Sequence, residues 1–355
     1  MYGQKISLGS CTTRDGGQYK GEMMSGRPHG KGSTLYENGD IFEGQYVKGK
    51  RQGYGIYTFA DGEKYEGEWM QDQQHGRGTF YFMNNNRYSG LWFRDYQQGH
   101  GIMYYYNGDV YDGEWYQDKR QGKGKYTFSN GAYYIGQWRN DQKNGKGFFD
   151  WGDGTTYDGL WLDNVRSGKG TNCYADGDVY VGDWDNDIQN GKGIYKFSNG
   201  DIYEGEYVEG ERTGAGIFKF ANGDNYTGHF YKGNKDGFGT FTWSNGDIYV
   251  GSWKNDRQNG HGKLTKKNGD IFDGSFKEGK MDGQVIIRYT DGSKYKGTYT
   301  NGKRNGAAIE VDKDGKRFEG TYVNDERDGT FVEKDRNGQI ITKGHYEHGR
   351  RYEDK

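Results

Sequence analysis

Aromatic residues and glycines recur along this chain with a fixed period of 23 residues. Fourteen consecutive units, the first at Tyr19 and the last at Phe318, carry an aromatic residue followed two positions later by a glycine, from Gly21 to Gly320. Around these positions apolar and polar residues alternate, which is the pattern of a β-strand with one covered face. Periods of roughly 20 to 50 residues are typical of repeat architectures, so the chain is predicted to consist of one repeated unit.

Each unit is predicted to contain two strands. In residues 203–207 (YEGEY) the two rings and the glycine fall on one face and the two acids on the other. In residues 191–197 (GKGIYKF) both glycines and both rings are predicted to share one face, with lysine outside. Gly, Asp or Asn occupies the turn after the first strand, as at Asp72, and Asn-Gly-Asp follows the second, as at 199–201. These residues tolerate the positive φ of tight hairpins, so the units are predicted to form consecutive β-hairpins.

The glycines are expected to leave hollows into which neighbouring rings lie flat. Such packing would shield one sheet without a second layer, and cross-strand aromatic pairs add about 0.2–1 kcal/mol each. The predicted fold class is all-β, a single elongated, twisted antiparallel sheet of consecutive β-hairpins. A closed β-propeller is an alternative, because two periods of 23 residues reach the length of about 40 residues that one blade needs.

The units divide the chain into three stretches. Residues 1–18 hold a partial unit or cap, and residues 19–271 hold eleven regular units. Residues 272–355 hold three divergent units and a partial cap, in which the second glycine is replaced by Val285, Ala308 and Phe331. The divergent stretch is predicted to be a region of dimerisation.

Composition narrows the possible classes of protein. With 65 glycines, one proline and 17% aromatic residues, the chain fits neither collagen nor a disordered segment. A net charge of −2 gives no general attraction to nucleic acid. The first residues lack the apolar segment of a signal peptide, and no apolar run is long enough to span a membrane. Cys11 and Cys173, seven repeats apart, are expected to be free thiols in a reducing, cytoplasmic location.

No catalytic, cofactor or metal site is expected. The carboxylates recur as equivalent solvent-facing residues, whereas acid–base catalysis needs carboxyls in contrasting environments. Gly-x-Gly strings such as 214–216 precede no helix that could receive a phosphate. His345 and His348 are the only histidines close in sequence, and two ligands do not complete a zinc site. The chain is therefore predicted not to be an enzyme.

Residues 65–69 (YEGEW) and 122–124 (GKG) resemble the MORN repeat, and the resemblance extends over residues 6–352. It implies a repeat-only protein similar to protist cytoskeletal scaffold proteins, with ciliary radial-spoke-head proteins as a second choice. Family members also associate through the C-terminal end of the array. The resemblance therefore implies a rod-like scaffold that docks cytoskeletal proteins.

The aromatic face is predicted to be the docking groove, because rigid rings supply contact area at low entropic cost. Its candidate residues are Trp69, Trp92, Trp115, Trp138, Trp161, Trp184, Trp253, Tyr57, Phe80, Phe128, Tyr195, Phe218 and Phe241. A smaller docking patch is predicted at Tyr81, Tyr96, Tyr104 and Tyr106, although cross-strand pairing on the outer face explains these tyrosines equally simply.

Two further surfaces are predicted, one from residues that depart from the repeat pattern and one from the charge of an edge. The self-association surface would contain Val285, Ile286, Ile287, Ala308, Ile309, Val311, Phe331 and Val332, unless these residues form only a capping repeat. One long edge is expected to be basic and the opposite edge, from Asp40 to Asp270, acidic. An alternative function is therefore a peripheral membrane adaptor that binds anionic phospholipids through Lys50, Arg51, Lys119, Arg120 and Lys143.

Overall fold

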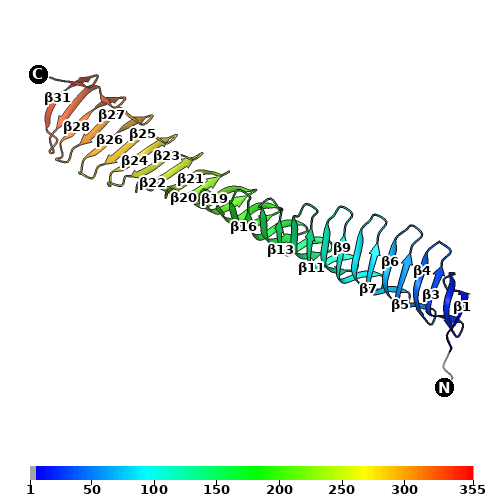
Figure 1. Cartoon of the computed structure of the whole chain (residues 1–355). Coiled ribbons are helices and arrows are strands. Elements are labelled where there is room, and N and C mark those ends of the chain that lie inside the picture. Colours follow the sequence, from blue (N-terminus) through cyan, green and yellow to red (C-terminus); the bar gives the residue numbers. More distant parts are fainter. Residues whose placement is uncertain (1–4, 355) are drawn as a thin grey trace. The chain divides into compact units, whose positions relative to one another are not determined.

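The protein is described by a computed structural model over residues 5–354. Every regular element in these residues is a β-strand, and within each of the two units given next, strands adjacent in sequence pair antiparallel, with β28 pairing with both β29 and β30 (Figure 1). The chain divides into two compact units, Met1–Asp176 and Gly177–Lys355. Each unit is an open antiparallel meander, which confirms the all-β hairpin fold. The division at residues 271 and 272 rests on sequence alone and stays a prediction.

The first unit contains fifteen strands: β1 (Ser7–Thr12), β2 (Gln18–Met24), β3 (Arg27–Leu35), β4 (Ile41–Val47), β5 (Lys50–Thr58), β6 (Lys64–Met70), β7 (Gln73–Tyr81), β8 (Arg87–Phe93), β9 (Tyr96–Tyr104), β10 (Val110–Tyr116), β11 (Lys119–Thr127), β12 (Tyr133–Arg139), β13 (Gln142–Asp150), β14 (Thr156–Leu162) and β15 (Val165–Cys173). The second contains β16 (Val179–Asp185), β17 (Ile188–Lys196), β18 (Ile202–Val208), β19 (Glu211–Lys219), β20 (Asn225–Tyr231), β21 (Asn234–Thr242), β22 (Ile248–Lys254), β23 (Arg257–Thr265), β24 (Ile271–Lys277), β25 (Lys280–Arg288), β26 (Lys294–Thr300), β27 (Lys303–Val311), β28 (Arg317–Val323), β29 (Glu326–Arg327), β30 (Gly329–Lys334), β31 (Ile340–Glu347) and β32 (Arg350–Glu353).

Two kinds of connection alternate along each unit. At one edge, the turn edge, two-residue turns such as Gln71-Asp72 have positive φ at both residues (51° and 74°), which defines a type I′ hairpin. At the other edge, the loop edge, five residues join the strands, as in 36–40. There Gly39 has a φ of 90° and its N–H donates to the Tyr36 carbonyl at 3.0 Å. The Asn-Gly signal thus marks the longer loop, and the tighter turns use Asp, Asn or Gly.

The first aromatic ring of each regular repeat lies on a pair of facing glycines. Gly67 pairs with Gly78, and a Cβ built on Gly78 would lie 2.3 Å from the Tyr65 hydroxyl oxygen. That hydroxyl donates to the Glu68 carbonyl at 2.9 Å, and Tyr65 has no exposed surface. Burial raises the pKa of such tyrosines, to about 12 for Tyr203, so they stay neutral donors. The predicted nesting of rings over bare backbone is confirmed.

The ring in the fifth position joins consecutive repeats. Trp92 meets Tyr65 of the preceding repeat and Tyr88 of its own, both edge-to-face, at centroid distances of 5.3 and 5.2 Å. Its indole Nε1–H donates to the Gly78 carbonyl at 3.2 Å. Edge-to-face contacts of this kind add about 0.5–1.5 kcal/mol beyond the area they bury. This face, called the ring face from here on, is therefore the core of each unit, and the opposite face is the outer face.

One prediction about the glycines is wrong. The glycine that opens the second strand, for example Gly122, was expected to lie on the ring face. Its φ is 68°, and it lies in a β-bulge where the register shifts between Gly113 and Trp115. A Cβ there would lie 2.0 Å from the Glu114 carboxylate, which belongs to the outer face. Glycine is needed at this position for backbone conformation rather than for ring packing.

Aspartates at the loop edge tie several repeats to the next. Asp224 Oδ1 accepts the Ser244 backbone N–H at 2.8 Å, which lowers the pKa of Asp224. Asp178 accepts the Ser198 N–H at 2.8 Å and then the Tyr195 hydroxyl at 2.7 Å, and its pKa is lowered as well. Asp40, expected on an acidic rim, is only 7% exposed. These carboxylates are structural acceptors, not a free acidic surface.

We expect acid to destabilise the array through these carboxylates. Because their pKa values in the folded protein lie below the unfolded value near 3.9, their stabilisation is complete above about pH 4 and is lost as the pH falls through the folded values. The Tm followed by circular dichroism should therefore fall between about pH 4 and pH 2. In D178N/D224N the fall should be smaller, while D314N, an exposed loop residue outside this series, should behave like wild type. An identical pH profile for D178N/D224N would contradict this role.

The three divergent repeats keep the ring face with different residues. Val285, Ala308 and Phe331, which replace the second glycine, are 1–4% exposed within one core cluster. Ala308 stands where a bare glycine would receive the ring of Tyr295. The Tyr295 hydroxyl is buried without a hydrogen-bond partner, unlike that of Tyr65. A methyl group at the glycine position thus displaces the ring above it from its usual acceptor.

Candidate partner-binding faces

The tryptophans predicted to line an exposed groove are core residues. Trp69, Trp92, Trp115, Trp138, Trp161, Trp184 and Trp253 are 4–6% exposed. Among the second-strand rings, Phe80, Phe218 and Phe241 are buried and Tyr57 and Tyr195 are half-buried. Phe128 lies just beyond β11, where Tyr126 holds the expected position. The expectation of exposed rings is wrong, because a fifth-position ring such as Trp92 is enclosed between the first-position rings of two repeats and cannot also face solvent.

The basic edge is folded onto the ring face. The Arg51 guanidinium lies 4.4 Å from the Trp69 ring centroid and donates to the Asp72 carbonyl at 2.7 Å. Arg120 lies 4.5 Å from the Trp138 ring in the same way, and Lys143 lies 4.1 Å from Trp161. The side chains of Arg51 and Arg120 are only 16% and 19% exposed. Lys50 and Lys119 are exposed, so two of the five predicted lipid-contacting residues face solvent freely.

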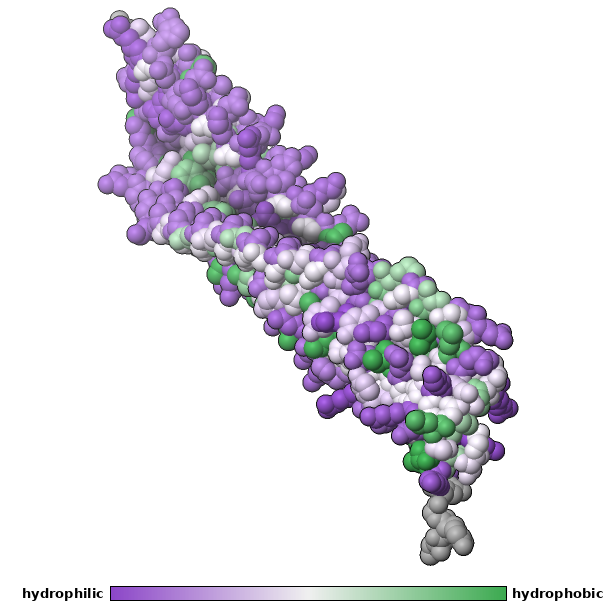
Figure 2. Space-filling model, turned by 45° about the vertical axis from the view of Figure 1, so that its right-hand side comes forward, coloured by the Kyte–Doolittle hydropathy of each residue, from purple (hydrophilic) through white to green (hydrophobic). Residues whose placement is uncertain are grey.

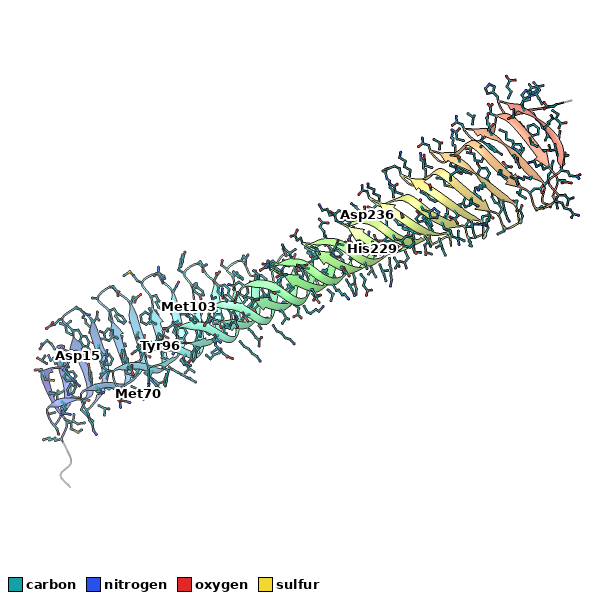
Figure 3. All side chains as sticks on the ribbon, turned by 180° about the vertical axis from the view of Figure 1, so that it is seen from behind. Asp15, Met70, Tyr96, Met103, His229 and Asp236 are labelled. Carbon is teal, nitrogen blue, oxygen red and sulfur yellow. The ribbon has the colours of Figure 1, made fainter. Side chains whose placement is uncertain are left out.

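The four tyrosines of the predicted patch do not form one surface. Tyr81 and Tyr104 lie on the outer face, where Lys64 and Arg87 cover them at 4.4 and 4.3 Å. Tyr96 begins β9 at the turn edge and Met103 lies near the other end of the strand (Figure 3). Tyr104 is the last residue of β9. Tyr106 stands in the following loop and is 75% exposed. Cross-strand pairing accounts for Tyr81 and Tyr104.

The predicted self-association residues separate between the two faces. Val285, Ile287, Ala308 and Phe331 are buried within the chain and are not available to a partner. Ile286, Ile309, Val311 and Val332 are half-buried on the outer face. For all of these except Val311, the equivalent position in regular repeats also holds β-branched residues, as at Ile194 and Ile217. The most exposed large apolar residues of this end are Ile340 and Ile341, 63% and 54% exposed in β31.

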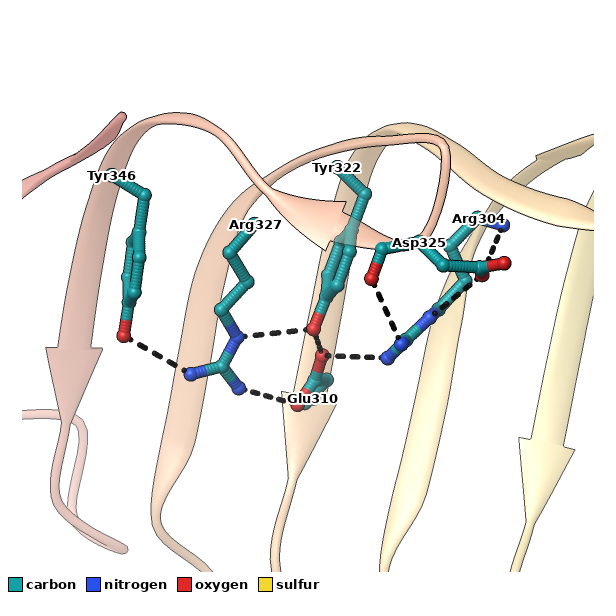
Figure 4. Close-up of polar contacts among 6 residues, drawn as sticks. All are labelled: Arg304, Glu310, Tyr322, Asp325, Arg327 and Tyr346. Carbon is teal, nitrogen blue, oxygen red and sulfur yellow. Dashed lines mark hydrogen bonds and ion pairs between the residues drawn. The ribbon is translucent and has the colours of Figure 1, made fainter. Parts of the chain in front are cut away.

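Polar residues replace rings on the ring face near the C-terminal end. Glu310 and Glu333 take the second-strand ring position. The Arg327 guanidinium donates to Glu310 at 2.8 Å, to the Tyr322 hydroxyl at 3.0 Å and to the Tyr346 hydroxyl at 3.3 Å (Figure 4). Arg351 binds Glu333 through two contacts of 3.1 Å. The charges of Glu310 and Glu333 are paired within this network, which lines a cavity of about 270 Å³.

Two surfaces of the first unit were not predicted from the sequence. Val47, Met70, Phe93 and Tyr116, each just after the fifth-position ring, are 41–54% exposed in consecutive repeats. Their signal is an apolar residue at a position that elsewhere holds Arg139 or Lys254. Figure 2 shows apolar patches on the visible part of this unit. The second is a groove on the ring face of about 470 Å³ between Gln74 and Asp141.

Among residues 5–354 there is no helix long and apolar enough to cross a membrane. The same residues contain no group of three or more His, Cys, Asp or Glu side chains arranged to hold a metal ion. Cys11 and Cys173 form no disulfide.

The chain resembles solved structures only weakly. No curated protein matches the chain. Among solved structures, the TCP domain of SAS-4 (dCPAP) from Drosophila melanogaster, in complex with a proline-rich motif of Ana2 (dSTIL), is 18% identical, with a TM-score of 0.30 over 44% of this chain and 84% of that one. The TCP10 domain of Danio rerio CPAP in complex with a peptide of STIL is 13% identical, with a TM-score of 0.18 over 77% and 98%. Virginiamycin B lyase from Staphylococcus aureus is 11% identical, with a TM-score of 0.13 over 90% and 100%. At these scores the likeness carries no functional weight.

The family model of the MORN repeat matches thirteen consecutive stretches. They are residues 19–41, 42–64, 65–87, 88–110, 111–133, 134–156, 157–179, 180–202, 203–225, 226–248, 249–271, 272–294 and 295–317. Each begins at the first aromatic residue of a repeat, so the matched period is the 23-residue period of the fold. The chain therefore belongs to the MORN-repeat family.

Proposed function

We propose that this protein is a non-enzymatic, cytoplasmic scaffold that docks cytoskeletal proteins and associates with itself through its C-terminal repeats. A chain of MORN repeats fits a structural or binding protein. The observation that carries the proposal is that a single sheet leaves its outer face and its edge strands available for contacts. The cytoskeletal assignment rests on the resemblance to scaffold proteins of the same repeat type.

The edge of β32 supports the self-association. No strand within residues 5–354 pairs with its far side, and all four of its residues are exposed. The Asp354 N–H donates inward to the Lys343 carbonyl, so by antiparallel alternation the Glu353 N–H points away from β31. An edge strand of this kind is a template for pairing with another chain. We expect two copies to join at this edge, with Ile340 and Ile341 close to the contact.

A proline at the edge tests this pairing. Glu353→Pro removes an outward N–H and obstructs the approach of a second strand, while the inward hydrogen bonds of β32 remain. We expect wild type to have the mass of a dimer by light scattering at micromolar concentration and E353P to have the mass of a monomer. Glu353→Gln, which keeps the N–H, should remain a dimer.

Two outcomes would contradict the self-association: a monomeric wild type, or a dimer unchanged by E353P. Circular dichroism on the same samples shows whether the variant has kept its strands. If E353P unfolds the last repeats, the mass of Ile341→Glu provides a second reading, because this side chain is exposed and the charge would lie at the proposed contact.

The membrane-adaptor alternative has less support. Arg51 and Arg120 interact with aromatic rings and with turn carbonyls, so they would have to leave those contacts to reach lipid headgroups. Lys50 and Lys119 stand three repeats apart in sequence. Two isolated lysines contribute about 1 kcal/mol each near an anionic surface, well below what stable membrane attachment requires.

A further inference from the structure

In several repeats the cationic end of an arginine or lysine side chain lies against the aromatic rings of the ring face. The residue after the start of the second strand lays its charged end beside the rings, as Arg51 does at 4.4 Å from Trp69. The same arginine donates its backbone N–H to Asp72 Oδ1 at 2.8 Å and Nη2 to the Asp72 carbonyl at 2.7 Å. Arg120 repeats this arrangement on Asp141, with Nε 3.1 Å from Oδ1. Aromatic rings and a turn aspartate therefore form a built environment for a guanidinium.

Two consecutive repeats lack that cation. Gln74 and Gln97 occupy the arginine position, and their backbone N–H groups still donate to Asp95 and Asp118 at 2.7 and 2.8 Å. The turns are thus preserved. In the part of the chain that the structure describes, no cation lies over the rings of Trp92 or Trp115, and neither turn carbonyl receives the side-chain donor that Arg51 supplies to Asp72.

A groove of about 470 Å³ lies over these two repeats. Phe82 and Tyr105, both half-buried, line it on one side, and the exposed Asp95 and Asp118 on the other. Its lining also contains Asp141, but that carboxylate already binds Arg120. Three carboxylates and one guanidinium give the lining a formal charge of −2.

The shape of the groove follows from the same substitutions. Gln74 and Gln97 are 8% and 5% exposed, and Trp92 and Trp115 stay buried at 6% and 5%. Met103, labelled in Figure 3, replaces the second-strand ring of other repeats and lines the floor. A guest would therefore contact Phe82 and Tyr105 and pair with Asp95 and Asp118, without displacing either tryptophan from the core.

We propose that this groove binds arginine side chains of a partner protein, one in each of the two repeats. This deepens the proposed function, on which it rests, by stating the chemistry of a docked segment. Arginine is favoured over lysine because its planar fork can serve a carboxylate and a carbonyl together, as Arg120 does. Stacking on an aromatic face adds about 0.5–2 kcal/mol for each cation.

The repeat spacing predicts the spacing of the arginines. Equivalent points in adjacent repeats are two strands apart, about 10 Å. In an extended polyproline II segment the residues i and i+3 point to the same side and are about 9.3 Å apart. The expected ligand is therefore an extended segment with the pattern Arg-x-x-Arg.

The test measures fluorescence anisotropy of a labelled peptide with two arginines three residues apart, titrated with the full-length protein. We expect binding to wild type and at least a roughly tenfold loss of affinity in Q74R/Q97R, in which the chain supplies its own cations as in the neighbouring repeats. Q258R makes the same substitution where the following turn holds Glu278 and Gly279 in place of an aspartate, and should leave binding unchanged. A peptide with citrulline in place of arginine should not bind.

A second pair of substitutions removes the acids without removing the turn acceptor. D95N/D118N reproduces Asn164, whose Oδ1 accepts the Lys143 N–H at 2.9 Å in the same turn position. It should weaken binding with no loss of strand signal in circular dichroism. The proposal is overturned if wild type does not bind, if Q74R/Q97R binds as well as wild type, or if citrulline and arginine peptides bind alike. Self-association depends on β32, so its failure would leave peptide binding intact, and the reverse also holds.

Discussion

Gly159→Val is expected to unfold the repeats around it, at a cost of about 3 kcal/mol or more. A Cβ at this position would lie 2.4 Å from the Tyr157 hydroxyl oxygen and 2.6 Å from the Gly170 Cα. One neighbour is backbone and the other is a ring enclosed on both sides, so neither can move away cheaply. The loss should be visible as a lower urea midpoint and as faster amide hydrogen exchange over residues 156–173.

A valine one residue earlier in the same strand is the matched control. Asp158 points to the outer face, where Val181 and Val250 stand at the equivalent position of other repeats. D158V should therefore change the urea midpoint little. Equal stability of G159V and wild type would contradict the packing of rings on glycine, and equal damage by D158V would show only that this strand tolerates no change.

Trp138→Ala is expected to cost about 3–5 kcal/mol, because it removes the ring that closes the contact between two repeats. Trp138 meets Tyr111 and Tyr134 at 5.3 and 5.2 Å, and its Nε1–H donates to the Gly124 carbonyl at 3.2 Å. The cavity would expose two buried tyrosines at once. Urea denaturation with hydrogen exchange over residues 111–150 measures both the size and the location of the loss.

Trp138→Tyr separates the contribution of ring packing from that of the indole hydrogen bond. Tyr46, Tyr207 and Tyr299 occupy this position in other repeats, so the ring contacts should survive and the loss should be about 1 kcal/mol for the missing hydrogen bond. If W138Y is as unstable as W138A, the indole hydrogen bond rather than ring packing carries the contact.

Much of the fold could be predicted because its causes are local and repeated. Alternation fixed the faces, the turn residues fixed the hairpins, and the glycine at 67 predicted the ring of Tyr65 above it. Each of these features depends on residues close in sequence and recurs in every regular repeat. The exception was Gly122, which lies in a β-bulge that turns it away from the ring face. A glycine in a bulge and a glycine beneath a ring are the same residue type, so the sequence does not distinguish the two positions.

The candidate sites were harder to predict than the fold, because the sequence shows which side chains share a face but not which of them cover one another. Trp69 was expected to be exposed, yet Arg51 and two ring neighbours enclose it. The groove at Gln74 and Gln97 is defined by the absence of a cation that other repeats have, and this becomes visible only once Arg51 is seen on the rings. Long basic side chains can fold back over apolar surface, so their charge does not show where they point.

The contacts between aromatic rings of consecutive repeats on the ring face also limit how the length of this protein can change. Tyr88 is enclosed by Trp92 and by Trp115 of the following repeat, so each repeat is completed by its successor. Removing or inserting 23 residues at any point of the regular array would restore the same neighbours at the junction. Any other number would bring a tyrosine opposite a residue that cannot enclose it. Length variants that keep the fold should therefore differ by whole repeats, so that gene duplication and unequal recombination can lengthen or shorten the array in steps that single-residue insertions cannot match.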